Sequence, residues 1–148
     1  MSEKPFLTPE ETVREYARAW NEGYDEHEES LKYLYTWNHI SHTDTRDMLM
    51  DEMTDELRPF FAAFPDQNLH VEEVITEGNK TFVRYTATMT MTGAMMGIEP
   101  TFKTAQVTIL EIDIHRDGRF HESWSRTDTL DQMEQQGLLG DAGKSFWY

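Results

Sequence analysis

Ionisable and apolar side chains alternate along a predicted hairpin near the C-terminal end of the chain. Asp117-Gly118 is a two-residue turn signal between two runs of alternating residues. If these residues form the turn, Arg116 pairs with Arg119, and paired residues share one face of the sheet. The predicted face contains Val107, Ile109, Glu111, Asp113, His115, Phe120, Glu122, Trp124, Arg126 and Asp128.

This mixed face predicts a cavity for a small ligand. It is too apolar for a solvated face and too charged for a plain core, and such a face beneath helices is typical of a binding pocket. Glu122 and Asp113 lie nearest the turn, where solvated acids at the strand ends explain them better. Asp128 comes four residues after Trp124, deeper in the sheet, and is predicted to face the cavity. The opposite face carries Leu110, Ile112 and Ile114 beside polar residues, which fits either a subunit contact or a wet surface.

Helices in the N-terminal half of the chain are predicted to cover this face. Thr8-Pro9-Glu10-Glu11 combines a capping residue, a proline at the first helical position and a capping-box glutamate. The first predicted helix ends near Gly23. A second, short helix is indicated by Leu31, Leu34 and Tyr35.

A third helix is predicted from about Thr45, with Leu49, Met53 and Leu57 facing inward. Pro59 cannot donate a backbone hydrogen bond, so a kink or a fresh turn is expected there. The segment 37–42, between the second and third helices, is predicted to be irregular.

The C-terminal half has the period of two that is typical of strands. Gly78-Asn79 marks a second tight turn, and 92–101 is predicted to be a longer loop. Helices followed by an antiparallel meander predict one α+β domain over 1–148, with a core of about 8–140 and a tail at 141–148. Strands are predicted at about 69–77, 81–91, 103–115 and 119–129, followed by a helix at about 130–136.

Composition excludes several classes of function. Twenty-eight acidic residues oppose thirteen basic ones, and the net charge of −15 argues against nucleic acids and anionic membranes as partners. The chain has no cysteine, which excludes disulfides, thiol nucleophiles and cysteine-ligated metals. We therefore expect a cytoplasmic protein, and the acidic surface is typical of proteins from salt-loving organisms.

Several short motifs together resemble the SnoaL-like polyketide cyclase family, also called ester cyclases, within the nuclear-transport-factor-2-like superfamily. Their order and spacing, over roughly 37 to 140, make the resemblance specific. The matching pieces are Phe64-Pro65-Asp66, Thr92-Gly93 through Gly97-Ile98 to Pro100-Thr101, Ile112-Asp113-Ile114, Asp117-Gly118-Arg119, and Glu122-Ser123-Trp124 followed by Asp128.

The resemblance implies a cone-shaped α+β barrel that forms a homodimer or a homotetramer. It also implies an enzyme that uses neither cofactor nor metal, and that closes a ring of a polyketide-like substrate by an intramolecular aldol reaction. Asp128 matches the aspartate that serves as general acid and base in the family. A salt bridge from Arg126 would weaken it as a base, and Ser123 stands where family members often have histidine. The alternative is a non-catalytic protein of the same fold that binds a small apolar or aromatic molecule.

The predicted site combines the mixed face with residues from other elements. His39-x-x-His42-x-Asp44 could be read as a metal site, but a polar pocket rim is the better interpretation, and the sequence does not decide which histidine faces the pocket. Met95 and Met96 are predicted to form a pliable lip, and Phe146-Trp147-Tyr148 to dock on this or a neighbouring subunit. With Asp128 as the catalytic residue, the predicted substrate-binding residues are Trp124, Arg126, Glu111, Ile109, Asp113, His39, His42, Tyr85 and Met89.

Overall fold

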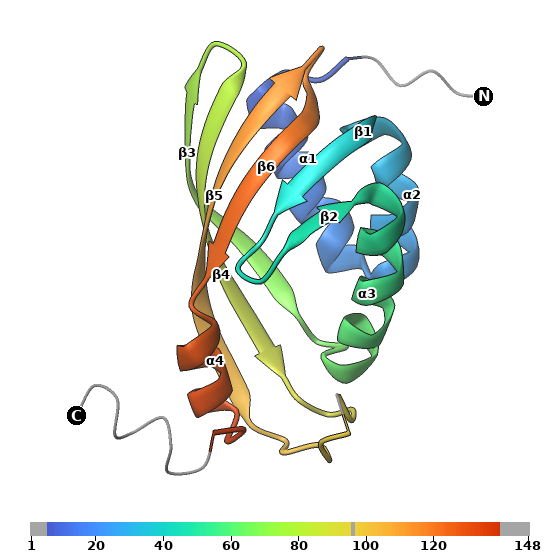
Figure 1. Cartoon of the computed structure of the whole chain (residues 1–148). Helices are drawn as coiled ribbons and strands as arrows, with labels where there is room; N and C mark the ends of the chain where they lie inside the picture. The colour runs from blue at the N-terminus through green and yellow to red at the C-terminus, as the bar shows by residue number, and fades with distance from the viewer. Residues whose placement is uncertain (1–5, 96, 140–148) are drawn as a thin grey trace.

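A computed structural model of the chain describes residues 6–95 and 97–139. Three helices at the N-terminal side pack against one face of a curved sheet, and a fourth lies at its lower end (Figure 1). In chain order the elements are α1 (Pro9–Glu22), α2 (Tyr24–Leu34), β1 (Tyr35–His42), β2 (Asp47–Leu49), α3 (Met50–Ala63), β3 (Asn68–Glu77), β4 (Lys80–Thr90), β5 (Thr104–Arg116), β6 (Arg119–Thr127) and α4 (Thr129–Gln135).

The start of α1 confirms the predicted capping box. The Thr8 hydroxyl accepts a hydrogen bond from the Glu11 amide, and the Glu11 carboxylate accepts one from the Thr8 amide, both at 3.2 Å. Gly23 then separates α1 from α2 with a φ of 117°, a conformation that only glycine adopts readily. Because α2 begins directly after this residue, it is longer than predicted and ends at Leu34.

The sheet has the strand order β2-β1-β6-β5-β4-β3. Strands β3 to β6 form the predicted antiparallel meander, whereas β1 pairs with β6 in parallel. The prediction that 37–42 is irregular is therefore wrong. The inward-facing residues of β1 are Tyr35, His39 and Ser41, so the strand lacks the apolar alternation that identifies most half-buried strands.

The third helix begins later than predicted, because the chain first forms the short edge strand β2. Leu49 belongs to that strand and is 56% exposed, so its predicted inward orientation is wrong. Met53 is buried as predicted, and Leu57 lines a cavity described below. Pro59 lies within α3, which continues to Ala63.

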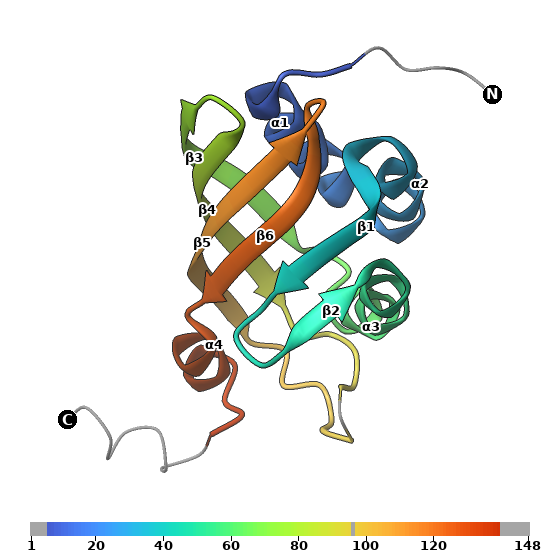
Figure 2. The same cartoon turned by 45° about the horizontal axis from the view of Figure 1, so that its top comes forward.

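A core fills the space between the concave face of the sheet and the helices α1, α2 and α3 (Figure 2). The α+β class and the helices on a curved sheet agree with the prediction. None of the helices in the described part of the chain is long and apolar enough to cross a membrane. Met96 and Phe146-Trp147-Tyr148 lie outside the described residues, as does most of the predicted tail. The largest buried core side chains include Tyr85, Phe64, Phe120, Leu34, Met91 and Val83.

One irregularity in the last hairpin determines which side chains face this core. His115 pairs with Phe120 as predicted, but Ile114 pairs with Glu122, so His121 is an extra residue in β6. Since side chains alternate across a strand, one extra residue reverses the orientation of all those that follow. The predicted face is therefore wrong beyond Phe120: Ser123, Ser125 and Thr127 point inward, and Glu122, Trp124 and Arg126 point outward.

Candidate active site

A cavity of about 460 Å³ lies between the concave face of the sheet and the helices. This volume is within the range of pockets that enclose small organic ligands. A larger groove on the outside, of about 700 Å³, is lined by Trp37 and Arg119 among others and contains neither of the two buried carboxyl groups described next. The inner cavity is lined mainly by Tyr16, Trp20, Tyr35, His39, Phe60, Phe64, Leu69, Met89, Met95, Ile109, Glu111, Ser123, Ser125, Thr127, Gln132 and Gln136.

Two carboxyl groups from β5 form the chemical centre of this region. Glu111 and Asp113 are two residues apart, so both side chains point to the concave face. Glu111 lines the cavity, and Asp113 is fully buried behind it with no exposed surface. The two side chains are hydrogen-bonded to each other.

The two carboxyl groups differ in how strongly they hold a proton. Burial and the neighbouring Asp113 raise the pKa of Glu111 well above its ordinary value of 4.5. Burial also raises the pKa of Asp113, but hydrogen bonds from Glu111, Ser123 and Thr81 to its charged form oppose that rise. Glu111 is therefore the group of the pair that favours the protonated form, and Asp113 is the acceptor of the hydrogen bond between them.

A short chain of hydrogen bonds connects Asp113 to β1. The Ser123 hydroxyl donates to Asp113 Oδ1 at 2.6 Å, and His39 Nε2 lies 2.9 Å from the same hydroxyl. Because the serine proton is given to Asp113, the network assigns a donating N–H to His39 Nε2. Burial lowers the pKa of His39 to about 3, so the ring is neutral, and its buried Nδ1 atom has no partner among the described residues. The hydrogen bond from Ser123 favours the ionised form of Asp113.

Three tyrosine rings surround the pair. Burial, and then the charges of Glu111 and Asp113, raise the pKa values of Tyr16, Tyr35 and Tyr85 well above 10. All three therefore remain neutral phenols that can donate a hydrogen bond. Tyr16 and Tyr35 line the cavity, and the buried Tyr85 hydroxyl has no partner among the described residues.

Six of the predicted site residues meet in or beside this cavity. Ile109, Glu111, His39 and Met89 line it. Asp113 and Tyr85 lie directly behind the lining, and the Tyr85 ring centroid is 6.4 Å from that of Tyr16. Between the two candidate histidines, the structure therefore places His39 at the cavity. Met95, one half of the predicted lip, also lines it.

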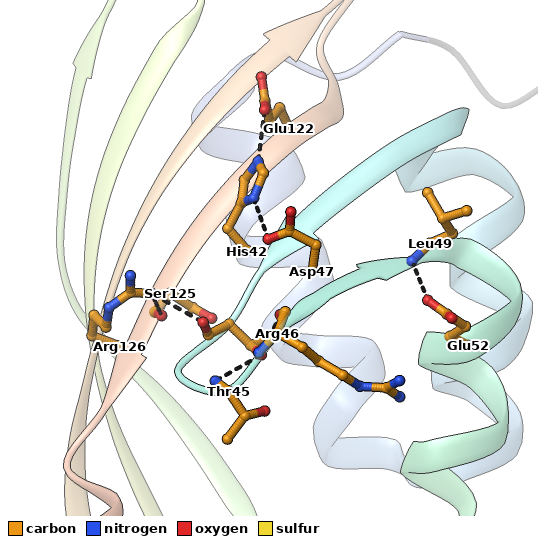
Figure 3. A network of polar contacts seen from close by, with 10 residues as sticks. His42, Thr45, Arg46, Asp47, Leu49, Glu52, Glu122, Ser125 and Arg126 are labelled. Atoms are coloured by element: carbon orange, nitrogen blue, oxygen red, sulfur yellow. Dashed lines mark hydrogen bonds and ion pairs between the residues drawn. The ribbon is translucent and has the colours of Figure 1, made fainter.

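Three other predicted residues lie on the outside of the sheet: Trp124 and Arg126 because of the extra residue in β6, and His42 because it alternates with the inward-facing Ser41 of β1. Trp124 stacks on the ring of His42 with centroids 5.0 Å apart. His42 bridges Asp47 Oδ1 at 2.6 Å and Glu122 Oε2 at 2.7 Å, which connects β2 to β6 through β1 (Figure 3). Hydrogen bonds to these carboxylates raise the pKa of His42. Arg126 is exposed and donates to the carbonyl oxygens of Thr43 and Ser125.

Asp128 is exposed at the N-terminus of α4, where its carboxylate accepts a hydrogen bond from the Asp131 amide at 3.3 Å. It is not one of the residues that line the cavity. Asp44 accepts hydrogen bonds from Thr127 and Thr129, and so ties the β1–β2 loop to the end of β6. His39, His42 and Asp44 thus point to different places, and the described residues contain no cluster of three potential metal ligands.

Sequence reasoning missed the polar groups that complete the cavity. Tyr16 and Trp20 fall within the first predicted helix and outside the predicted site, and Ser123 is noted only as part of a motif shared with the family. Gln67 and Gln136 carried no motif at all. The serines and threonine of β6 gave one usable signal, since small polar residues opposite buried carboxyl groups are natural hydrogen-bond donors to them.

The family comparison covers nearly all of the described chain. The family model for SnoaL-like polyketide cyclases matches residues 10–136. No curated protein matches the chain significantly.

Solved structures of the same fold support this result. IdmH from Streptomyces antibioticus, described as a proposed polyketide cyclase, is 23% identical with a TM-score of 0.78, over 88% of this chain and 99% of that one. AclR from Streptomyces galilaeus, a proposed hydroxylase, is 22% identical with a TM-score of 0.77, over 87% and 95%. A protein of ketosteroid isomerase-like fold from Catenulispora acidiphila, in complex with trimethylamine, is 13% identical with a TM-score of 0.69, over 89% and 95%. The chain belongs to the SnoaL-like polyketide cyclase family, and it has the ketosteroid isomerase-like fold of these neighbours.

Proposed function

We propose that this protein is an enzyme that catalyses an intramolecular aldol-type cyclisation of a polyketide-like molecule, with the Glu111–Asp113 pair as its acid and base. The observation that carries the proposal is a pair of neighbouring buried carboxyl groups, of which Glu111 lines a largely apolar cavity and has a raised pKa while Asp113 lies behind it. Family resemblance assigns the acid/base role to Asp128. We place it on Glu111 instead, because Asp128 is exposed and caps α4.

A pair with one proton can act both as base and as acid. The proton of Glu111 moves along the hydrogen bond to Asp113, which leaves Glu111 as the carboxylate. Glu111 then removes a proton from a substrate carbon flanked by two carbonyl groups. The electron pair released from that C–H bond forms a new C–C bond to a third carbonyl carbon of the same molecule.

The cycle closes without any external reagent. The carbonyl oxygen that receives the electron pair becomes an alkoxide, and Glu111 returns the proton to it. Substrate and product are isomers, and the pair ends with the one proton it had at the start. The phenols of Tyr16 and Tyr35, which keep their protons, can donate hydrogen bonds to the enolate oxygen in between.

The first step can be tested with ethyl naphthoylacetate, an aromatic β-keto ester that cannot cyclise. We expect the protein to accelerate deuterium exchange at the carbon between its two carbonyl groups, followed by proton NMR in D₂O. Replacing Glu111 by Gln should reduce this acceleration by about 10²- to 10⁴-fold, which is the usual contribution of a general acid/base group.

Asp128→Asn is the matched control, since it makes the same carboxyl-to-amide change at the residue that the family resemblance indicates. This variant should exchange the probe at nearly the rate of the unmodified protein. Loss of exchange in Asp128→Asn with normal exchange in Glu111→Gln would contradict the proposal. Binding of the probe without any acceleration would instead support a non-catalytic binding protein.

A further inference from the structure

Two glutamine side chains in the cavity wall are buried with unused hydrogen-bond donors. Gln136 has no exposed surface, and Gln67 is 8% exposed. Both line the cavity, and the Nε2 atom of each lacks a partner among the described residues. A buried amide without a partner destabilises a fold, so such groups call for a specific explanation.

Hydrogen bonds of a neighbouring residue hold the backbone next to each glutamine. Gln136 follows α4, whose residue Gln135 accepts a hydrogen bond from the Gln106 amide at 2.7 Å and donates one to the Gln106 carbonyl at 3.0 Å. The Gln136 side-chain oxygen accepts a hydrogen bond from Gln132 Nε2 at 3.4 Å. The NH₂ group of Gln136 therefore remains without a partner among the described residues. Gln67 follows Asp66, whose carboxylate accepts a hydrogen bond from the Thr90 amide at 2.8 Å. A rotation about the terminal torsion of either glutamine, which is a broad one, turns the NH₂ group within the wall.

The strand register separates both donors from the carboxyl pair. Gln67 precedes Asn68, which pairs with Thr88 of β4, and Thr88 pairs with Gln106 of β5. Gln106, to which α4 is anchored, and Glu111 are five residues apart on β5, about 17 Å along the strand at 3.4 Å per residue. The cavity therefore has two polar regions, one that donates and accepts protons at Glu111 and one that offers amide donors near α4.

The charges of the wall define what these donors can bind. The described lining residues include the acids Asp44, Glu56 and Glu111 but no lysine or arginine. Arg46 pairs with Glu56 from outside the lining, so none of the described lining residues offers a cation to a carboxylate or phosphate ligand. A neutral acceptor, such as the carbonyl oxygen of an ester, ketone or amide, requires only the N–H donors.

We propose that Gln136, assisted by Gln67, binds a neutral carbonyl oxygen at the α4 end of an elongated ligand. On the proposed function, this contact sets which substrate carbon reaches Glu111, and the inference takes its substrate class from that function. Gln136 and Gln67 then determine specificity for substrates that carry an ester or ketone far from the reacting carbon.

Isothermal titration calorimetry with three probes of similar size tests the subsite. Methyl naphthoate carries a neutral carbonyl, propylnaphthalene replaces its ester by a hydrocarbon chain, and the naphthoate anion carries a charge. We expect the ester to bind about tenfold more tightly than either other probe, which corresponds to one hydrogen bond made in a dry site. Gln136→Leu should reduce this preference to near one while leaving the affinity for propylnaphthalene unchanged.

Equal affinities of the unmodified protein for ester and hydrocarbon would overturn the proposal, as would an equal loss of both in Gln136→Leu. Gln136→Met and Gln67→Leu provide the same comparison if Gln136→Leu does not fold. Repeating the titrations with Glu111→Gln separates this inference from the proposed function. If Glu111 has no role in proton transfer, the preference for the ester persists and only the exchange experiment fails.

Discussion

At the scale of single residues, the raised pKa that suits Glu111 for proton transfer also makes the folded protein less stable as the pH rises. Its pKa in the folded protein is raised well above 4.5, the ordinary value that the unfolded chain retains. Between these two pKa values the folded state binds more protons than the unfolded state, so the free energy of unfolding decreases as the pH rises. A neutral side chain of the same shape avoids this loss.

Glu111→Gln should therefore raise the melting temperature at pH 7 and above, by about 3 °C or more for a chain of this size. The gain should shrink as the pH falls and vanish below 4.5, where Glu111 is protonated in both states. Differential scanning calorimetry between pH 4 and 9 measures both curves. Parallel curves for the variant and the unmodified protein would show that Glu111 is not buried as a protonated acid.

At the scale of elements, the sequence predicts the bounds of the strands accurately but assigns the side chains of β6 to the wrong faces of the sheet. The four strands of the meander were placed within about two residues, because period-two alternation is a local property of the chain. The orientation of Trp124 and Arg126 depends on the extra residue His121, and nothing in the local sequence distinguishes a bulged strand from a regular one. The candidate site shows the same difference. Glu111 and Ile109 were predicted on the inward face and line the cavity, and His39 was one of two alternatives. Asp128 was placed by a register that the protein does not adopt.

Deletion of His121 tests this explanation directly. Without this residue the hairpin becomes regular, but Glu122 still pairs with Ile114 and Ser123 with Asp113, so Ser123 stays inward and Trp124 and Arg126 stay outward. We therefore expect the deletion variant to keep its cooperative thermal transition, although a deletion inside a regular strand would reverse every residue that follows. His121→Ala, which keeps the chain length and loses only the hydrogen bond to Thr36, should melt close to the unmodified protein.

If the deletion variant lost its cooperative transition, or melted at least about 10 °C lower, His121 would not be an extra residue of β6. Circular dichroism at increasing temperature, followed for all three proteins under the same conditions, is sufficient to decide. The deletion variant should also exchange the β-keto ester, since Asp113 keeps its hydrogen bond from Ser123.

At the scale of the whole molecule, we expect the outer face of the sheet to bind a second copy of this chain. Leu110 and Ile112 are 42% and 48% exposed there, beside Trp124. The net charge of −15 on each copy opposes such association, and salt screens that repulsion. We therefore predict that the homodimer or homotetramer implied by the family resemblance forms more readily at high salt.

Light scattering after size-exclusion chromatography should show a mass that is a multiple of 17.4 kDa at high salt, and a larger monomer fraction at low salt. Ile112→Glu should yield monomers at both salt concentrations. Lys32→Gln on α2 changes the net charge by the same amount and should associate normally. A monomer at every salt concentration would mean that this face is simply solvated.

We propose that the Glu111–Asp113 pair holds one proton at neutral pH, on the carboxyl group that lines the cavity. Carbon-13 NMR of the side-chain carboxyl carbons, with Glu111→Gln to assign the signal, follows this proton as the pH changes. We expect Glu111 to be protonated at pH 7 and Asp113→Asn to lower its pKa, because the neighbouring charge is removed. A Glu111 that titrates near 4.5 and does not respond to Asp113→Asn would show that the two carboxyl groups do not share a proton.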